Sequence, residues 1–192
     1  MANITSLAEQ LVQGGTAGAF EPQRKNNWFF FVPGLIERPI VVALETGFAP
    51  TQETEEQELH FLNEKKFYAG KTSWAEGSLS LKDFVDRGSA TAMINWQQKI
   101  YSPQTGAVNF AKVYKINCSV QLFGPDGTLD REWSLLGCWP KSVNYGELDM
   151  TSAEKVVIQA SIRYDKAIPT KVAALAGVPV NTGGIQGVGV AV

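Results

Sequence analysis

Residues 133–165, WSLLGCWPKSVNYGELDMTSAEKVVIQASIRYD, read as a strand, a sharp turn and a second strand. In the second strand apolar and polar residues alternate, which places one set of side chains on a single face. That set comprises Val156, Ile158, Ala160, Ile162 and Tyr164. A slip of one residue would move the whole set into water, so this alternation specifies the register of the strand.

The first half of this stretch predicts a strand that ends at a proline. Alternation places four residues on one face of it: Trp133, Leu135, Gly137 and Trp139. Pro140 is expected to end the pairing because it has no N–H to give to a neighbouring strand.

The rest of the chain carries further strand patterns and one helical pattern. Strands are expected at Trp28–Val32, Ile40–Thr46, Trp74–Val85 and Lys115–Phe123, and a return strand from Leu129. The turn between the last two is Gly-Pro-Asp-Gly, residues 124–127, which favours a hairpin. Residues 89–101 predict a packed helix with Ser89 as its N-cap. The expected fold is mainly β, an antiparallel barrel or sandwich of six to eight strands with one packed α-helix.

Residues 48–64 differ from the rest because they contain TQETEEQEL, with four glutamates and no basic residue. Since neither a helical nor a strand period is clear, they are expected to form a long acidic loop. The loop would either be solvated or reach a neighbouring subunit, with Lys65, Lys66 or another basic group as partner.

Composition argues against several functional classes. The formal net charge of −2 offers no basic surface for tight nucleic-acid binding. No segment approaches the roughly 20 apolar residues of a membrane-spanning helix, and the N-terminus lacks the basic residues of a secretion signal. We therefore expect no membrane association.

Enzyme chemistry has little support in the sequence. His60 is the single histidine and lies far along the chain from Cys118 and Cys138, which are expected to be buried small hydrophobic residues. Glu147 and Asp149 are close enough for a carboxylate pair, but the flanking turn residues favour a capping or interface role. We expect no catalytic site, metal or cofactor.

The polar faces of the strands carry Ser, Gln and Asn rather than Lys and Glu. A freely solvated face usually carries more charge, particularly at a sheet edge. This pattern favours surfaces covered by copies of the same chain, or a water-filled lumen along which a charged polymer slides.

The order of the motifs resembles a known family. Residues 135–167, LLGCWPKSVNYGELDMTSAEKVVIQASIRYDKA, resemble the C-terminal half of tail tube proteins from contractile-tailed bacteriophages. NNWFFFV, residues 26–32, resembles the first strand of that family, and the similarity extends over about residues 20–168. The inner tubes built from haemolysin-coregulated proteins belong to the same fold group.

This resemblance implies a structural subunit. Six copies would form a ring, and rings would stack into a hollow conduit that delivers the genome. Its implied partners are further copies, the tail sheath, the baseplate and the tail terminator, with DNA passing through the lumen without specific binding. The implied location is the virion, after synthesis in the host cytoplasm. The alternatives are the inner tube of an injection or secretion device and, from another class, a monomeric β-barrel binding module.

The resemblance also implies a division of the chain. Residues 1–19 would form an arm, residues 20–168 the β domain and residues 169–192 a Gly- and Val-rich tail. The arm and the acidic loop are expected at ring-to-ring contacts, and the lumen is expected to be neutral to negative. The predicted interface residues are Glu53, Glu55, Glu56, Glu58, Trp139, Pro140, Glu147, Asp149, Arg163 and Asp165.

Overall fold

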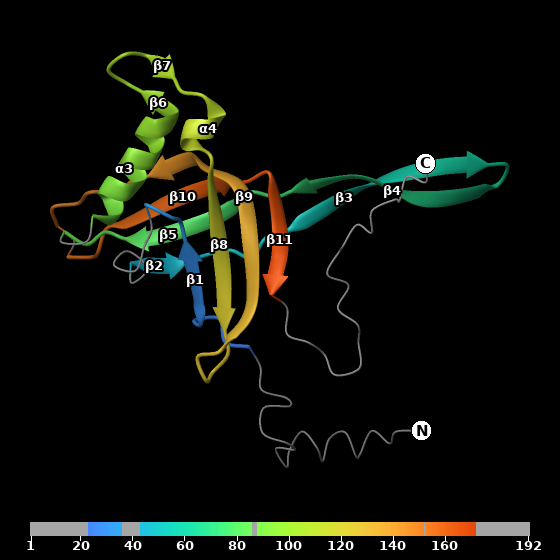
Figure 1. The fold of residues 1–192 in the computed structure, drawn as a ribbon, viewed down its shortest axis with the longest axis horizontal. Helices are drawn as coiled ribbons and strands as arrows, with labels where there is room; N and C mark the ends of the chain where they lie inside the picture. Colours follow the sequence, from blue (N-terminus) through green and yellow to red (C-terminus); the bar gives the residue numbers. More distant parts are fainter. Residues whose placement is uncertain (1–22, 36–42, 86–87, 152, 172–192) are drawn as a thin grey trace, which may run out of the picture.

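The computed structural model describes residues 23–35, 43–85, 88–151 and 153–171. Its main sheet has seven antiparallel strands in the order β1-β8-β9-β10-β5-β2, with β11 also paired to β9 (Figure 1). The bounds of these strands are Trp28–Phe31 (β1), Leu44–Thr46 (β2), Gly77–Lys82 (β5), Ile116–Phe123 (β8), Leu129–Asn144 (β9), Val157–Arg163 (β10) and Lys166–Lys171 (β11). The mainly β, antiparallel fold expected from the sequence is confirmed.

Strand β9 runs through the whole sheet and bends at Gly137, which has φ +67°. The bend changes which residues face the core, since Leu135 is buried before it and Cys138 after it. The predicted common face for Leu135, Gly137 and Trp139 is therefore wrong beyond Leu135. The prediction that Pro140 ends the pairing is also wrong, because Pro140 lies opposite Ile162 where the β9–β10 register shifts. An irregularity of this kind tolerates the missing proline N–H.

The alternation in β10 is confirmed. Ile158, Ala160, Ile162 and Tyr164 are at most 2% exposed, whereas Gln159 is exposed. The chain kinks after Tyr164 and continues as β11, which pairs with the first half of β9. This second strand, which extends to Lys171 beyond the boundary placed at residue 168, has no counterpart among the predicted elements.

Most of the other strand predictions hold. The strands β1 and β8, the turn at residues 124–127 and the return into β9 lie where expected. β2 confirms the end of its predicted strand, whereas residues 40–42 lie outside the described part. β5 ends at Lys82, so the strand predicted to reach Val85 is shorter, and Val85 is fully exposed.

The predicted helix is α3, Ser89–Ile100, which buries Ala92, Met93 and Trp96 against the sheet. Gly88, rather than Ser89, is the N-cap. The Ser89 hydroxyl instead lies 3.1 Å from the carbonyl of Lys82 and ties the helix to the end of β5. A short second helix, α4 (Ala111–Tyr114), and the small β6–β7 hairpin (Tyr101–Ser102, Ala107–Val108) were not predicted.

One hydrophobic core lies between the bent sheet and α3. Its largest fully buried side chains include Trp96, Phe30, Leu79, Leu81 and Leu135. Cys118 and Cys138 are buried within it as free thiols, as predicted. A hydrogen bond with Cys138, together with burial, raises the pKa of Cys118 far above its usual range. The predicted arm, residues 1–19, lies outside the described part, and so does the predicted tail, residues 169–192, apart from residues 169–171 in β11.

Candidate assembly surfaces

A long two-stranded hairpin stands where the acidic loop was expected. It consists of β3 (Gln52–Phe61) and β4 (Glu64–Trp74), and it projects away from the main sheet (Figure 1). Every residue of β3 is exposed. The loop prediction is therefore wrong, because the pairing with β4 overrides the weak strand propensity of the glutamates.

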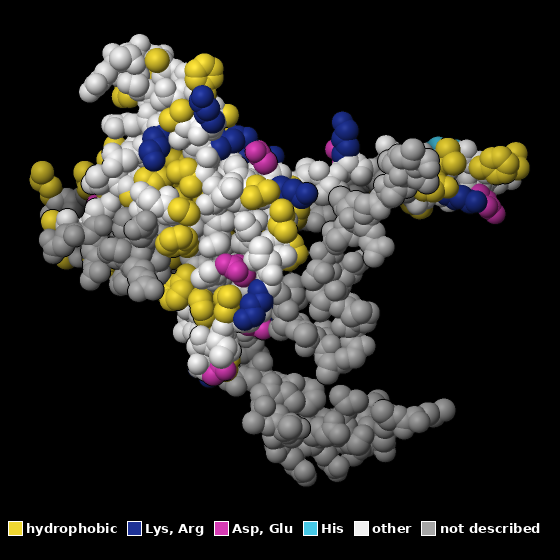
Figure 2. All heavy atoms as spheres, viewed as in Figure 1, with side chains coloured by type: hydrophobic (Ala, Val, Ile, Leu, Met, Phe, Trp, Pro, Cys, Tyr) yellow, Lys and Arg dark blue, Asp and Glu magenta, His cyan; other side chains and the backbone are white. Residues whose placement is uncertain are grey.

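The hairpin has two chemically different faces. Directly paired residues share a face, and the register pairs Phe61 with Glu64, Leu59 with Lys66 and Gln57 with Tyr68. We call Leu59, Phe61 and Tyr68 the apolar face of the hairpin. Their exposed fractions are 53%, 66% and 54%, and Figure 2 shows hydrophobic atoms at the far end of the hairpin. In the single copy nothing covers this face. Because an isolated two-stranded hairpin is at best marginally stable in water, we expect another element to cover it.

The opposite face of the hairpin carries charged side chains together with the Phe67 ring, which pairs with Glu58 and is 59% exposed. The Glu58 carboxylate lies 3.1 Å from Lys65 Nζ and 3.4 Å from His60 Nε2. Lys65, proposed from the sequence as a partner for the acidic segment, thus pairs within the same hairpin. Exposed pairs of this kind contribute little to stability. Glu53, Glu55 and Glu56 are exposed along β3, so the hairpin presents an acidic surface.

A second uncovered surface lies at the opposite part of the molecule, where α3, the β6–β7 hairpin and α4 meet. We call residues 89–115 the helical end. Its exposed apolar side chains are Tyr101, Val108, Phe110 and Val113, with Phe110 80% exposed. Lys112 Nζ lies 5.9 Å from the centre of the Phe110 ring, and Figure 2 shows basic and hydrophobic atoms side by side here. The segment 89–115 contains three lysines and no acidic residue.

The helical end is rigidly attached to the core. Trp96 is fully buried, and its indole N–H donates to the carbonyl of Tyr114 at 3.0 Å, which fixes α4 against α3. The Tyr114 ring packs edge-on against Trp139 of β9, with centroids 6.2 Å apart. These contacts therefore hold α4 against α3 and the sheet without a partner.

A groove of about 460 Å³ runs beside the helical end, between α3 and the second half of β9. Trp139 and Pro140, two of the predicted interface residues, line it together with Ile94 and Tyr101. On its rim the hydroxyl of Tyr145 donates to Gln97 Oε1 at 2.6 Å, and partial burial raises the pKa of Tyr145. The groove is thus largely apolar with a polar rim.

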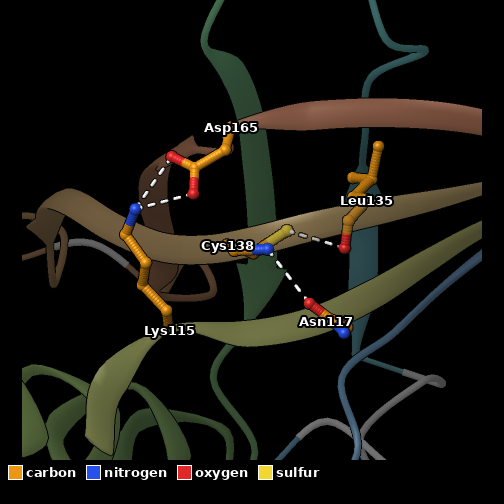
Figure 3. A network of polar contacts seen from close by, with 6 residues as sticks. Lys115, Asn117, Leu135, Cys138 and Asp165 are labelled. Atoms are coloured by element: carbon orange, nitrogen blue, oxygen red, sulfur yellow. Dashed lines mark hydrogen bonds and ion pairs between the residues drawn. The ribbon is translucent and has the colours of Figure 1, made fainter. Parts of the chain in front are cut away.

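The predicted interface residue Asp165 forms an ion pair beside the bend of β9. Lys115 Nζ lies 2.9 Å and 2.7 Å from its two carboxylate oxygens (Figure 3). Beside this ion pair the N–H of Gly137 donates to Asn117 Oδ1 at 3.1 Å. Arg163 lies opposite Trp139 on β10 and is half-buried. Both residues lie where the sheet bends.

Glu147 and Asp149 lie in the exposed loop after β9 and border an open depression. Asp149 accepts hydrogen bonds from the backbone N–H of Thr151 at 2.9 Å and from its hydroxyl at 2.8 Å, which lowers the pKa of Asp149. This geometry matches the turn-capping role weighed from the sequence.

The ten predicted interface residues thus occupy four separate places. The glutamates lie on the hairpin, Trp139 and Pro140 in the groove, Arg163 and Asp165 at the bend, and Glu147 and Asp149 in the loop. Sequence reasoning missed the aromatic residues of both uncovered surfaces, including Tyr68 and Phe110. The segment FLNEKKFY, residues 61–68, held a signal, since a short polar turn there separates two apolar pairs.

Within the described ranges, none of the helices is long and apolar enough to cross a membrane. The same ranges contain no group of three or more His, Cys, Asp or Glu residues arranged to hold a metal ion.

The overall fold is similar to that of solved components of contractile injection systems. The anti-feeding prophage cap, described as a tube terminating cap, has a TM-score of 0.63 and 16% identity, covering 84% of this chain and 99% of that one. A chain from the extended sheath-tube complex of the PVC extracellular contractile injection system has a TM-score of 0.58 and 16% identity, covering 90% and 100%. Because the sequence identities are only 16%, this structural likeness establishes the fold alone.

The sequence identifies the family. Residues 31–167 match the model of the T4-like virus tail tube protein gp19, and the chain belongs to this family. No curated protein matches the sequence. The resemblance found in residues 135–167 is thereby confirmed, and the chain is a structural, tail-tube-like protein of a phage or phage-like contractile particle.

Proposed function

We propose that this chain is the repeating subunit of the inner tail tube, in which six copies form a ring and rings stack into a hollow conduit for the genome. The observation that carries this proposal is the apolar face of the β3–β4 hairpin. Leu59, Phe61 and Tyr68 are each more than half exposed on a hairpin that lacks a third layer. Burying side chains of this size contributes about 1.5–3 kcal/mol each, and a neighbouring copy can supply that burial.

Ring closure would use the open edges of the main sheet. Among the described residues, strands β1, β2 and β11 each have one neighbour in it. An unpaired strand edge is a template for pairing with another chain, and a head-to-tail contact repeated by a rotation of about 60° closes a ring of six. The hairpin would then join one ring to the next.

The conduit must let DNA pass. Duplex DNA carries about one negative charge per 1.7 Å, so a lysine-lined bore would retain it by counterion release. We expect the bore to be neutral to negative, and the tube to be surrounded by the sheath and bounded by baseplate and terminator. The particle would be assembled in the host cytoplasm and act as a virion.

Two related roles compete with a phage tail tube. The solved chains that share the fold come from injection systems, which favours the inner tube of such a device, and one of them is a tube terminating cap. A terminator would form single rings that do not stack, whereas a tube subunit forms stacks. Adjacent terminase and capsid genes would favour a phage, and adjacent effector genes an injection device.

Size-exclusion chromatography combined with negative-stain electron microscopy tests the proposal. The purified chain, seeded with baseplate where needed, should give six-fold rings and tubes. The paired variant Leu59→Ser and Phe61→Ser should remain folded but fail to form tubes. Val85→Ser, at a fully exposed site outside the hairpin, serves as the control. Only monomers at high concentration, with or without seeding, would instead support a monomeric binding module.

A further inference from the structure

Two surfaces of this protein are uncovered in the single copy, and both are apolar. One is the apolar face of the hairpin, Leu59, Phe61 and Tyr68. The other is the helical end, where Val108 is 73% and Phe110 80% exposed. Both are held by regular structure, so neither can turn inward to bury itself.

The two surfaces carry opposite charge. The hairpin, residues 52–74, has five glutamates and three lysines, a formal charge of −2. The helical end, residues 89–115, has three lysines and no acidic residue, a formal charge of +3. Apolar patches with complementary potentials around them are the usual composition of a specific protein interface.

We propose that the hairpin of one copy seats its apolar face on the helical end of an adjacent copy. This inference rests on the proposed tube and names the surface that receives the hairpin. In Figure 1 the hairpin extends far to one side of the sheet while the helical end lies at another extremity, so one copy cannot make the contact with itself. The contact joins two different surfaces, and such a contact propagates into a stack when its rotation does not close a ring.

Specific residues on each side fit this contact. Glu64 pairs with Phe61 and therefore lies on the apolar face, where it can approach a lysine of the next copy. Lys112 lies over the exposed ring of Phe110 and is the corresponding cation. The neighbouring groove of about 460 Å³, with Trp139 and Ile94 in its lining, can accept an apolar side chain from the hairpin tip. Leu62 at that tip is 91% exposed.

A second groove offers a competing acceptor. It has a volume of about 590 Å³ and lies beside Trp28 and Phe48. Arg24 and Lys25 line it, but so does Glu45, so its charge is mixed. The helical end has no acidic residue of its own, and although Lys115 is paired with Asp165, Lys99 and Lys112 leave it basic. It is therefore the better complement of the acidic hairpin.

Cysteine cross-linking in assembled tubes tests the contact. Leu62→Cys protein is mixed with Val108→Cys protein, tubes are formed, and a short bis-maleimide is added. The native thiols Cys118 and Cys138 are buried and do not compete. A covalent dimer that forms in the mixture, and not in tubes of either variant alone, therefore joins the hairpin tip of one copy to the helical end of another. A mixture of Leu62→Cys and Lys25→Cys proteins is the matched control, and we expect dimers only in the first mixture.

Charge reversal provides an independent readout. Lys112→Glu should raise the critical concentration for tube formation at least about tenfold, and the added change Glu64→Lys should recover most of the loss. Lys25→Glu, at the competing groove, should leave the critical concentration for tube formation unchanged. Normal assembly of Lys112→Glu, or cross-linking only in the Lys25→Cys mixture, would overturn the inference while the tube itself stands. Failure of the unmodified protein to form tubes would overturn the proposed function as well.

Discussion

At the scale of single residues, Gly137 determines the shape of the sheet. Its φ of +67° is a conformation that favours glycine, and it reverses the facing of β9. A Cβ at this position would collide with the Asp165 carboxylate, which the Lys115 ion pair holds in place. The predicted interface residue Asp165 is thus a structural residue of the bend.

Replacing Gly137 tests this role. Gly127, in the β8–β9 turn, also has a positive φ, but a Cβ there meets open space. Gly127→Ala should cost about 1–2 kcal/mol of backbone strain alone. Gly137→Ala should cost clearly more, because it also displaces Asp165 from Lys115. Urea denaturation of both variants gives the two free energies of unfolding, and equal losses would contradict the role assigned to the bend.

Neighbouring residues of β10 should respond in opposite ways. Ile162 is fully buried, so Ile162→Asp places an unpaired charge in the core and should leave the chain unfolded. Arg163 faces the other way and is half-buried, so the Arg163→Ala variant should fold. Its assembly into tubes is the property expected to be impaired. Circular dichroism spectra and thermal melts distinguish the two. Native-like melting of Ile162→Asp would invalidate the assignment of the core face.

At the scale of elements, the sequence could predict those whose pattern and surroundings agree. The alternation of Ile158, Ala160 and Ile162 predicted β10 because one face of that strand contacts the core. On β9 the pattern and the surroundings disagree. Gly137 inverts the alternation of buried and exposed residues, and the strand continues through Pro140, which was expected to end it. The helix α3 was predictable because Met93 and Trp96 fall on one buried face.

The hairpin was not predictable from its first strand. TQETEEQEL has no apolar residue before Leu59, so the alternation that marks a half-buried strand is missing. In the folded chain its pairing with β4 supplies the order, and its apolar residues gather near the turn. The glutamates predicted as interface residues lie on this hairpin, but the aromatic residues beside them were not recognised.

At the scale of the whole molecule, the described part is an open structure with three exposed sheet edges and two uncovered apolar surfaces. A monomer rarely leaves such surfaces uncovered, and their charges are of opposite sign on the hairpin and the helical end. Membership of the tail tube family gives these features a common explanation, because each is satisfied by further copies of the same chain.

Stacking should therefore depend on ionic strength. Exposed charges are screened over about 10 Å at 0.1 M salt and about 3 Å at 1 M. The critical concentration for tube formation should rise several-fold between these salt concentrations, as measured by light scattering or sedimentation. The Lys112→Glu variant should show a weaker or reversed dependence. A critical concentration that falls with salt in the unmodified protein would show that charge does not contribute.

The most direct measurement is an electron cryomicroscopy reconstruction of the assembled particle. We predict a six-fold tube in which Leu59, Phe61 and Tyr68 of each hairpin are buried against an adjacent copy. A tube in which this face remains in contact with solvent, or a protein that remains monomeric with the hairpin uncovered, would contradict the account.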